Sequence, residues 1–353
     1  MELTWRGKTL PNNETQTRTQ YRLVNRQIYL PQDTELHTPQ PSQAAPIQGI
    51  TNAWYNRLVH ADRLQALVAL LPEFANQVNL IYVDPPFMTG RTFNNGSQIT
   101  APTRISYRDV WNNDPDSYLQ WLYETFYYLY LLLANNGSLY IHLDWRAAHY
   151  AKILLDEIFS APPATRGGGF KNEIIWHYQS GGRARKTFAR KHDTILLYTK
   201  SARYSFHSER IGQRRGTAQR NHMRRQVNAN GQVSWTIRSN GRLYTYTEDA
   251  TLSPTDVWID ISHLHQKDPE RTGYATQKPE ALLERIILAS SEEHDIVLDC
   301  CCGSGVTPAV AERLGRRWLA CDQSEVAINV TSERLCKAQK QHPFALQYVT
   351  TIE

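Results

Sequence analysis

Residues 80–87 read Leu-Ile-Tyr-Val-Asp-Pro-Pro-Phe, an apolar run that stops at a carboxylate, two prolines and an aromatic ring. A short run that is rich in β-branched and aromatic residues and bounded by proline is typical of a buried parallel strand. Open parallel sheets bind their ligands beyond the carboxyl ends of the strands. The run therefore predicts an α/β fold in which Asp84 stands at a ligand site.

The loop that follows this strand carries groups suited to one kind of substrate. Asp84 offers a carboxylate, and the carbonyl of Asp84 or Pro85 offers a second acceptor that proline holds rigid. Two such acceptors suit a substrate NH2 group, and Phe87 offers a flat face on which a base taken out of a duplex can stack. The alternative is an ordinary turn, because Asp and Pro are common turn residues.

A second motif lies far downstream, where residues 296–307 read Ile-Val-Leu-Asp-Cys-Cys-Cys-Gly-Ser-Gly-Val-Thr. This pattern predicts a buried strand, a glycine turn that lets a ligand approach the backbone, and a helix over 306–314. A further strand over 318–321 ends at Asp322, 19 residues beyond Gly303. A carboxylate about 20 residues past a glycine loop commonly holds ribose hydroxyls.

The glycine loop favours one class of nucleoside ligand over another. A dinucleotide site needs a third glycine, and that position is Pro308 here. Asp299 before the loop and Asp322 after it favour an adenosine-type cofactor that carries no pyrophosphate. S-adenosylmethionine fits this description.

With both motifs in place, the chain resembles the DNA methyltransferases of the amino-group family, which methylate adenine N6 or cytosine N4. The resemblance covers residues 50–340. In that family the Asp-Pro-Pro-Phe/Tyr loop is catalytic, which assigns this role to Asp84, Pro85, Pro86 and Phe87. The catalytic loop precedes the cofactor loop, as in the circularly permuted beta class. The resemblance implies a Rossmann-like methyltransferase fold, with a mostly parallel sheet, helices on both faces and a small target-recognition insertion.

A third matching element is the stretch 275–280, which reads Ala-Thr-Gln-Lys-Pro-Glu and precedes a helical pattern that Pro279 is well placed to start. In the family this element lines the methionine end of the cofactor. Residues 58–62 resemble the element whose acidic residue, here Asp62, approaches the cofactor's adenine. The cofactor site implied by the resemblance consists of Asp62, Gln277, Lys278, Pro279, Asp299, Gly303, Ser304, Gly305, Thr307 and Asp322.

Two positions depart from the family pattern. The cofactor loop usually carries an aromatic residue two positions after its Asp, where this chain has Cys301. One packing contact with the cofactor therefore differs from the family's. The ribose carboxylate is often Glu in the family, and Asp322 is shorter by one methylene but keeps the same chemistry.

Positive charge is concentrated between the catalytic loop and the cofactor loop. Residues 183–225 hold 13 lysines and arginines against two acids, whereas the whole chain has a formal net charge of +5. A patch of that density predicts phosphate contacts, and it lies where the beta class places its target-recognition region. The alternative is a solvated basic loop. The predicted DNA-contact residues are Arg183, Arg185, Lys186, Arg190, Lys191, Arg214, Arg215, Arg224 and Arg225.

We expect four regions along the chain. Residues 1–50, rich in Gln, Thr, Asn and Pro, are expected to be an N-terminal extension of low order. Residues 51–199 form the catalytic half of the methyltransferase domain and 258–353 its cofactor-binding half, with the target-recognition region over 200–257 between them.

Composition narrows the setting in which the protein works. No apolar run approaches the length of a membrane span and no secretory signal is visible, so a cytoplasmic location at the nucleoid is expected. The five cysteines include no Cys-x-x-Cys pair, so they are interpreted as small buried residues and no metal site is predicted. Asp144, which closes another predicted strand over 138–143, is interpreted as a turn former.

The predicted reaction is methyl transfer from S-adenosylmethionine to N6 of an adenine flipped out of double-stranded DNA. Adenine is favoured because the loop begins with Asp84, whereas similar cytosine-N4 members usually begin with Ser. The alternatives are a cytosine-N4 methyltransferase, an RNA methyltransferase, and a non-catalytic DNA-binding protein that keeps the fold. The resemblance also allows two further partners: a second copy of the chain in a homodimer, which is common in the beta class, and a cognate restriction endonuclease encoded separately.

Overall fold

The computed structural model describes the greater part of the chain. The described residues are 2–9, 11, 20–31, 54–94, 105–111, 114–160, 167–179, 184–214, 222–247, 250–252, 254–338 and 342–352. Within this part of the chain, no helix is both long and apolar enough to span a membrane.

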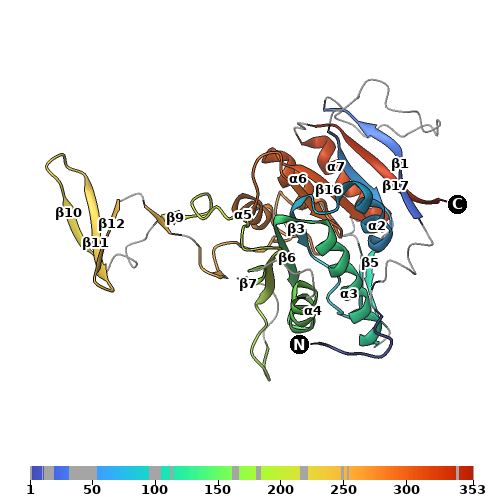
Figure 1. Ribbon diagram of the computed structural model, residues 1–353, viewed down its shortest axis with the longest axis horizontal. Helices are drawn as coiled ribbons and strands as arrows, with labels where there is room; N and C mark the ends of the chain where they lie inside the picture. Colours follow the sequence, from blue (N-terminus) through green and yellow to red (C-terminus); the bar gives the residue numbers. More distant parts are fainter. Residues whose placement is uncertain are drawn as a thin grey trace.

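A ten-stranded mixed sheet forms the centre of the protein (Figure 1). Its order is β1-β17-β2-β16-β15-β3-β6-β8-β7-β14. In chain order its strands are β1 (Gln20–Tyr29), β2 (Asn56–His60), β3 (Val78–Val83), β6 (Leu133–Leu143), β7 (Gly169–His177), β8 (His192–Thr199), β14 (Val257–Trp258), β15 (Ile296–Asp299), β16 (Arg317–Asp322) and β17 (Phe344–Ile352).

The strands from β17 to β6 in this order all run parallel to one another. Their carboxyl ends therefore meet at one edge of the sheet. β15 pairs with β3, so that Leu298 lies opposite Ile81 although the two segments are more than 200 residues apart. This pairing brings the loop after Asp84 next to the loop after Asp299. The predicted mostly parallel, permuted methyltransferase sheet is confirmed.

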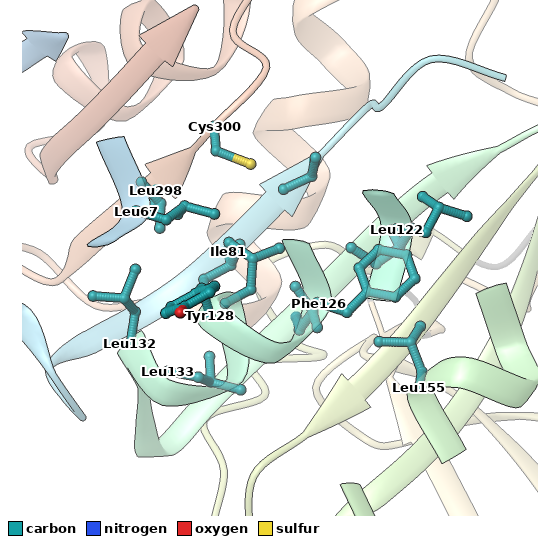
Figure 2. Close-up of a cluster of buried hydrophobic side chains, with 14 of the residues drawn as sticks. Leu67, Ile81, Leu122, Phe126, Tyr128, Leu132, Leu133, Leu155, Leu298 and Cys300 are labelled. Carbon is teal, nitrogen blue, oxygen red and sulfur yellow. The ribbon is translucent and has the colours of Figure 1, made fainter. Parts of the chain in front are cut away.

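Helices cover both faces of the sheet because its central strands are apolar on both sides. On one face lie α2 (Arg63–Phe74), α3 (Pro115–Leu132) and α4 (Ala148–Ser160), whose side chains pack around Ile81 and Leu298 (Figure 2). On the other face lie α5 (Glu280–Ser290), α6 (Val306–Arg313) and α7 (Glu325–Lys337), which pack around Leu80, Val297 and Trp318. Each fully buried Leu or Phe stabilises the fold by about 1.5–3 kcal/mol, so these two cores hold the edge of the sheet rigidly.

The N-terminal region corrects one prediction. Residues 1–50 were expected to have low order, whereas Gln20–Tyr29 forms β1, which pairs antiparallel with β17 at the edge of the sheet. Tyr29 is buried and stacks on Phe344 with 4.4 Å between the ring centroids. The segment looks polar in sequence because an edge strand buries few of its side chains. Residues 12–19 and 32–50 lie outside the described residues.

Among the described residues, three smaller sheets lie outside the central one. β4 (Arg91–Asn94) and β5 (Ile105–Asp109) pair as a ribbon that follows the Asp-Pro-Pro-Phe loop. β10 (Arg224–Val227), β11 (Val233–Ser239) and β12 (Arg242–Thr247) form a three-stranded antiparallel sheet, and β9 (Gln213–Arg214) pairs with β13 (Thr251–Leu252). The β10–β12 sheet projects from the body of the protein, at the left of Figure 1.

Candidate active site

A cavity of about 490 Å³ lies at the carboxyl edge of the parallel strands. The loops after β2, β3, β15 and β16 supply much of its wall, together with the β4–β5 ribbon and the segment before α5. Twelve of the site residues predicted from sequence line it: Asp62, Asp84, Pro85, Pro86, Phe87, Gln277, Lys278, Asp299, Gly303, Ser304, Thr307 and Asp322. The fold thus collects three distant motifs around one cavity.

Two residues predicted to bind the cofactor have other places in the structure. Pro279 is the N-cap of α5 and Gly305 the N-cap of α6, and neither is among the residues that line the cavity. Gly305 has a φ of 72°, and a Cβ there would lie 2.7 Å from Thr331 on α7. We therefore assign both residues to helix starts, and Gly305 also to the close approach of α6 and α7.

Asp84 and Lys278 form an ion pair inside the cavity. Lys278 Nζ donates a hydrogen bond to Asp84 Oδ2 at 2.5 Å, and it lies 5.3 Å from the centroid of the Phe87 ring. The other oxygen, Asp84 Oδ1, is buried and has no hydrogen-bond partner among the described residues. A buried acceptor without a donor costs free energy. Asp84 Oδ1 is therefore ready to accept a hydrogen bond from a ligand.

Asp109, which the sequence did not single out, fixes the loop that follows Asp84. Its fully buried carboxylate accepts hydrogen bonds from the backbone N–H groups of Phe87, Met88 and Thr89, at 2.7 to 3.2 Å. It also accepts from the Thr89 hydroxyl and the indole N–H of Trp111. Hydrogen bonds to an ionised group are stronger than neutral ones. Asp109 thus holds the backbone on which the Phe87 ring is mounted.

A hydrogen-bonded network of polar side chains lies behind Phe87. The His142 ring is stacked beside the Phe87 ring with 6.2 Å between centroids. Its Nδ1 lies 2.8 Å from the hydroxyl of Tyr82, and its Nε2 lies 3.2 Å from a carboxylate oxygen of Asp193. The other oxygen of Asp193 accepts a hydrogen bond from the hydroxyl of Tyr178, which lines the cavity with Asp193. This network was not predicted from the sequence, because its members come from four different strands or strand ends.

The carboxylates of the cofactor half are held by the backbone. Asp322 accepts hydrogen bonds from the N–H groups of Gly303 and Ser324, at 2.9 and 2.8 Å. Asp299 accepts from the Thr307 hydroxyl at 2.6 Å and from the backbone N–H of Cys301. Burial raises the pKa of Asp322, and it raises the pKa of Asp299 to about 7. A cationic ligand would offset the cost of ionising such buried acids.

The donor set fits S-adenosylmethionine. Seven aspartates line the cavity, and four of them, Asp62, Asp84, Asp299 and Asp322, are site residues predicted from sequence. Carboxylates suit a ligand that carries a sulfonium and an ammonium group. Asp322, at the end of β16, would hold the ribose hydroxyls of such a ligand, which stays a prediction. A Cβ added to Gly303 would lie 3.1 Å from the ring of Tyr274, so glycine at this position lets Tyr274 pack closely against the loop.

Other groups of the wall are engaged with the protein itself. Gln277 lines the cavity, but its amide bonds to the segment 270–272. Asp144 also lines the cavity, and its carboxylate accepts hydrogen bonds from the backbone and the side chain of Arg146. This pattern agrees with the interpretation of Asp144 as a turn former. Four of the five cysteines are buried, as predicted, whereas Cys301 is half-buried.

The predicted DNA-contact residues lie away from the cavity wall. Arg185, Lys186 and Arg190 are exposed and Lys191 is half-buried on the loop between β7 and β8. Arg224 and Arg225 are exposed on β10. Arg183 and Arg215 fall outside the described residues, and only the backbone of Arg214 is described, in β9.

In the part of the chain that the structure describes, no group of three His, Cys, Asp or Glu side chains could hold a metal ion. The rings of His263 and His265 lie 4.8 Å apart, and burial lowers the pKa of His263.

Comparison with known proteins identifies the family. The family model for N6/N4 DNA methylases matches residues 78–333. The Type II methyltransferase M.HpaI of Haemophilus parainfluenzae is 28% identical over 280 residues, which cover 79% of this chain and 74% of the relative. The DNA adenine methyltransferase YhdJ of Escherichia coli (strain K12) is 27% identical over 303 residues, which cover 80% of this chain and 87% of the relative.

A solved structure supports the fold. The PvuII DNA methyltransferase, described as cytosine-N4-specific, superposes with a TM-score of 0.51 at 15% identity, over 79% of this chain and 86% of that one. Fold and cavity thus define an S-adenosylmethionine-dependent methyltransferase. The chain belongs to the N6/N4 DNA methylase family and is an amino-group DNA methyltransferase.

Proposed function

We propose that the protein methylates N6 of an adenine that is flipped out of double-stranded DNA into the cavity beside Phe87. The observation that supports this proposal most strongly is the difference in hydrogen bonding between the two carboxylate oxygens of Asp84. One carboxylate oxygen is held by Lys278, and the other is buried without a partner among the described side chains and backbone groups. An exocyclic NH2 group is a donor of the required kind, and a base in the stack cannot reach a buried carboxylate without being flipped.

The chain's own groups then act on the amine. Asp84 Oδ1 and the carbonyl of Pro85 accept its two N–H bonds, which leaves the nitrogen lone pair free to point at the methyl donor. Lys278 holds the carboxylate in place, and Asp109 and Tyr118 hold the loop, the latter through a 2.8 Å hydrogen bond from its hydroxyl to the Pro86 carbonyl. S-adenosylmethionine supplies a methyl group on a sulfonium centre. Positioning and preorganised acceptors supply most of the rate acceleration.

Atoms and charges balance in this reaction. A nitrogen–carbon bond forms as the carbon–sulfur bond breaks, and the sulfur keeps the electron pair of that bond. The methylated amine then loses one proton, which passes through Asp84 to water. No group of the protein is left covalently changed, which agrees with buried cysteines whose pKa is raised above the ordinary value, such as Cys302.

The choice of adenine rests on the first residue of the catalytic loop and on one relative. The loop begins with Asp84, and similar cytosine-N4 enzymes usually begin with Ser. YhdJ, at 27% identity, is named as an adenine methyltransferase. The PvuII enzyme is named as cytosine-specific, but at 15% identity it bears on the fold alone.

The region 200–257 is proposed to recognise the target sequence through the β10–β12 sheet. Side chains alternate between the two faces of a strand, so Arg224 and Arg225 point to opposite faces. The cross-strand row of Arg225 contains Trp235 and Tyr246, whereas that of Arg224 contains Thr236 and Thr245. In the polar row Thr236 is buried, whereas Arg224 and Thr245 on either side of it are exposed, so these two side chains are the better candidates for contacts with base edges. A homodimer and a separately encoded restriction endonuclease remain predictions from the family resemblance.

The test is methyl transfer from labelled S-adenosylmethionine to unmethylated duplex DNA, followed by digestion and identification of the labelled nucleoside. We expect labelled N6-methyl-2′-deoxyadenosine. Labelled N4-methyl-2′-deoxycytidine would confirm methyl transfer to DNA but overturn the choice of adenine. Asp84→Ala should abolish transfer while the affinity for S-adenosylmethionine stays within a few-fold, and an active variant would overturn the role of Asp84. Duplex RNA of the same base composition serves as the control polymer and should receive no label.

A further inference from the structure

One aromatic side chain on the surface is fully open to water. Phe188 is 99% exposed, more than any other large hydrophobic side chain in the described part of the protein, where Ile259 follows at 74%. Single exposed apolar residues are common on protein surfaces. A phenyl ring that is 99% exposed adds little to the stability of the fold. The residues around it therefore indicate whether it has another role.

The loop that carries Phe188 starts and ends at the wall of the cavity. It joins β7 to β8 at the carboxyl edge of the sheet, and its base is closed by a hydrogen bond of 2.9 Å from Tyr178 N to the Lys191 carbonyl. Tyr178 and Asp193, on either side of this closure, line the cavity. Figure 1 shows the described part of the connection between β7 and β8 extending away from the sheet. Phe188 thus lies on a loop, here called the arm (residues 184–191), whose two ends adjoin the wall of the proposed base pocket.

The positive charge of this arm indicates which kind of partner it would bind. Residues 184–191 read Ala-Arg-Lys-Thr-Phe-Ala-Arg-Lys, with four cations and no acid. Arg190 stacks on the exposed ring of Trp145, 3.9 Å from its centroid, and Trp145 follows the cavity-lining Asp144. A docking protein would need a continuous apolar surface, whereas the neighbours of Phe188 in this loop are small or cationic. Phosphates on both sides of an inserted ring match this pattern.

We propose that Phe188 is a wedge that enters the base stack of DNA beside the position left by the flipped base. The inference rests on the proposed function, because a wedge is needed only where a base leaves the duplex. Flipping removes two stacking contacts and opens a gap, and an inserted aromatic ring restores stacking on the gap's neighbours. Arg185, Lys186 and Arg190 would hold the two backbones while the ring inserts.

The test compares two DNA duplexes and three proteins. The methylated site is first mapped with the unaltered protein on plasmid DNA. One duplex then carries the mapped site with a normal pair at the target base, and the other carries an abasic position opposite that base, which removes its pairing. The proteins are the unaltered chain, Phe188→Ala, and the control Phe206→Ala, which removes another exposed phenylalanine, one on the segment after β8 at the opposite edge of the sheet.

We expect Phe188→Ala to lower kcat/KM on the paired duplex by about ten-fold or more, and to leave kcat/KM on the abasic duplex within two-fold of the unaltered protein. Phe206→Ala should match the unaltered protein on both duplexes, and Phe188→Trp should retain activity. The melting temperature of Phe188→Ala should be unchanged, since the ring is 99% exposed. Equal loss on both duplexes, or no loss on either, would overturn the wedge. A protein that methylates no DNA at all would overturn the proposed function, and the wedge with it.

Discussion

Lys278 and Asp84 are 194 residues apart in the sequence, yet 2.5 Å separates Lys278 Nζ from Asp84 Oδ2. The ion pair joins the loop after β3 to the segment before α5, and therefore joins the catalytic half of the domain to its cofactor half. Both side chains are largely buried, at 12% and 19% exposure. Because Oδ2 is held in this way, Oδ1 keeps one orientation toward the cavity.

Lys278→Met should therefore lower kcat more than it weakens DNA binding. Without the ammonium group the Asp84 carboxylate can turn, and misplacement of a catalytic group by about 1 Å costs about 100-fold in rate. We expect a loss of about 10- to 100-fold in kcat under saturating DNA and S-adenosylmethionine. Lys337→Met, at a lysine whose side chain is 78% exposed on α7, is the matched control. A kcat within two-fold of the unaltered protein would show that the ion pair does not position Asp84.

Asp109→Asn should loosen the catalytic loop. The NH2 group that replaces one carboxylate oxygen cannot accept a hydrogen bond. If it replaces Oδ2, the N–H groups of Phe87 and Thr89 and the Thr89 hydroxyl would face another donor. We expect the free energy of unfolding to fall by about 2–3 kcal/mol and methyl transfer to fall strongly. S-adenosylmethionine affinity, measured by calorimetry, should change by only a few-fold because Asp109 serves the loop around Phe87. A variant with unchanged transfer would remove Asp109 from the positioning role.

Gly305→Ala should destabilise the start of α6. Its φ of 72° is unfavourable for alanine, and the new Cβ would lie 2.7 Å from Thr331. We expect a loss of about 2–4 kcal/mol in the free energy of unfolding, measured with urea. Gly90→Ala is the matched control, because Gly90 has the same φ and no atom within 4 Å of an added Cβ. Equal losses in the two variants would show that the contact with Thr331 adds nothing.

The features predictable from sequence were those whose signal is local. β3 and β15 are short apolar runs because parallel strands are buried on both faces, and each is followed by a distinctive loop. The Asp-Pro-Pro-Phe loop and the glycine loop could therefore be placed at strand ends, and the parallel pairing of β3 with β15 then placed them side by side.

Other features depend on contacts that no local pattern reports. α3 was not predicted, because its 18 residues carry aromatic and leucine side chains on nearly all sides and show no narrow apolar stripe. Asp109 lies in a ribbon 20 to 22 residues after its partners at 87–89, and only the tertiary fold aims its carboxylate at them. His142 looks like an ordinary strand residue until Tyr82 and Asp193 are seen on either side of it.

The buried Asp299 should give the stability of the protein a pH dependence of known sign. Burial raises the pKa of Asp299 to about 7 from an ordinary value of 3.8, so between these two pH values the folded state holds a proton that the unfolded state has lost. The free energy of unfolding contributed by this residue is therefore fully present below pH 4 and is lost as the pH rises to about 7. Asp299→Asn removes the titration.

Urea unfolding of both proteins without cofactor, at pH 5, 6, 7 and 8, measures this contribution. Burial also raises the pKa of the nearby Asp322. Asp322 titrates in both proteins, so its effect largely cancels when their free energies of unfolding are subtracted. The free energy of unfolding of Asp299→Asn, relative to that of the unaltered protein, should rise by about 2–3 kcal/mol between pH 5 and pH 7. This difference should change little above pH 7. A difference that stays constant over this range would mean that Asp299 is ionised throughout. It would then present a full negative charge to S-adenosylmethionine at every pH tested.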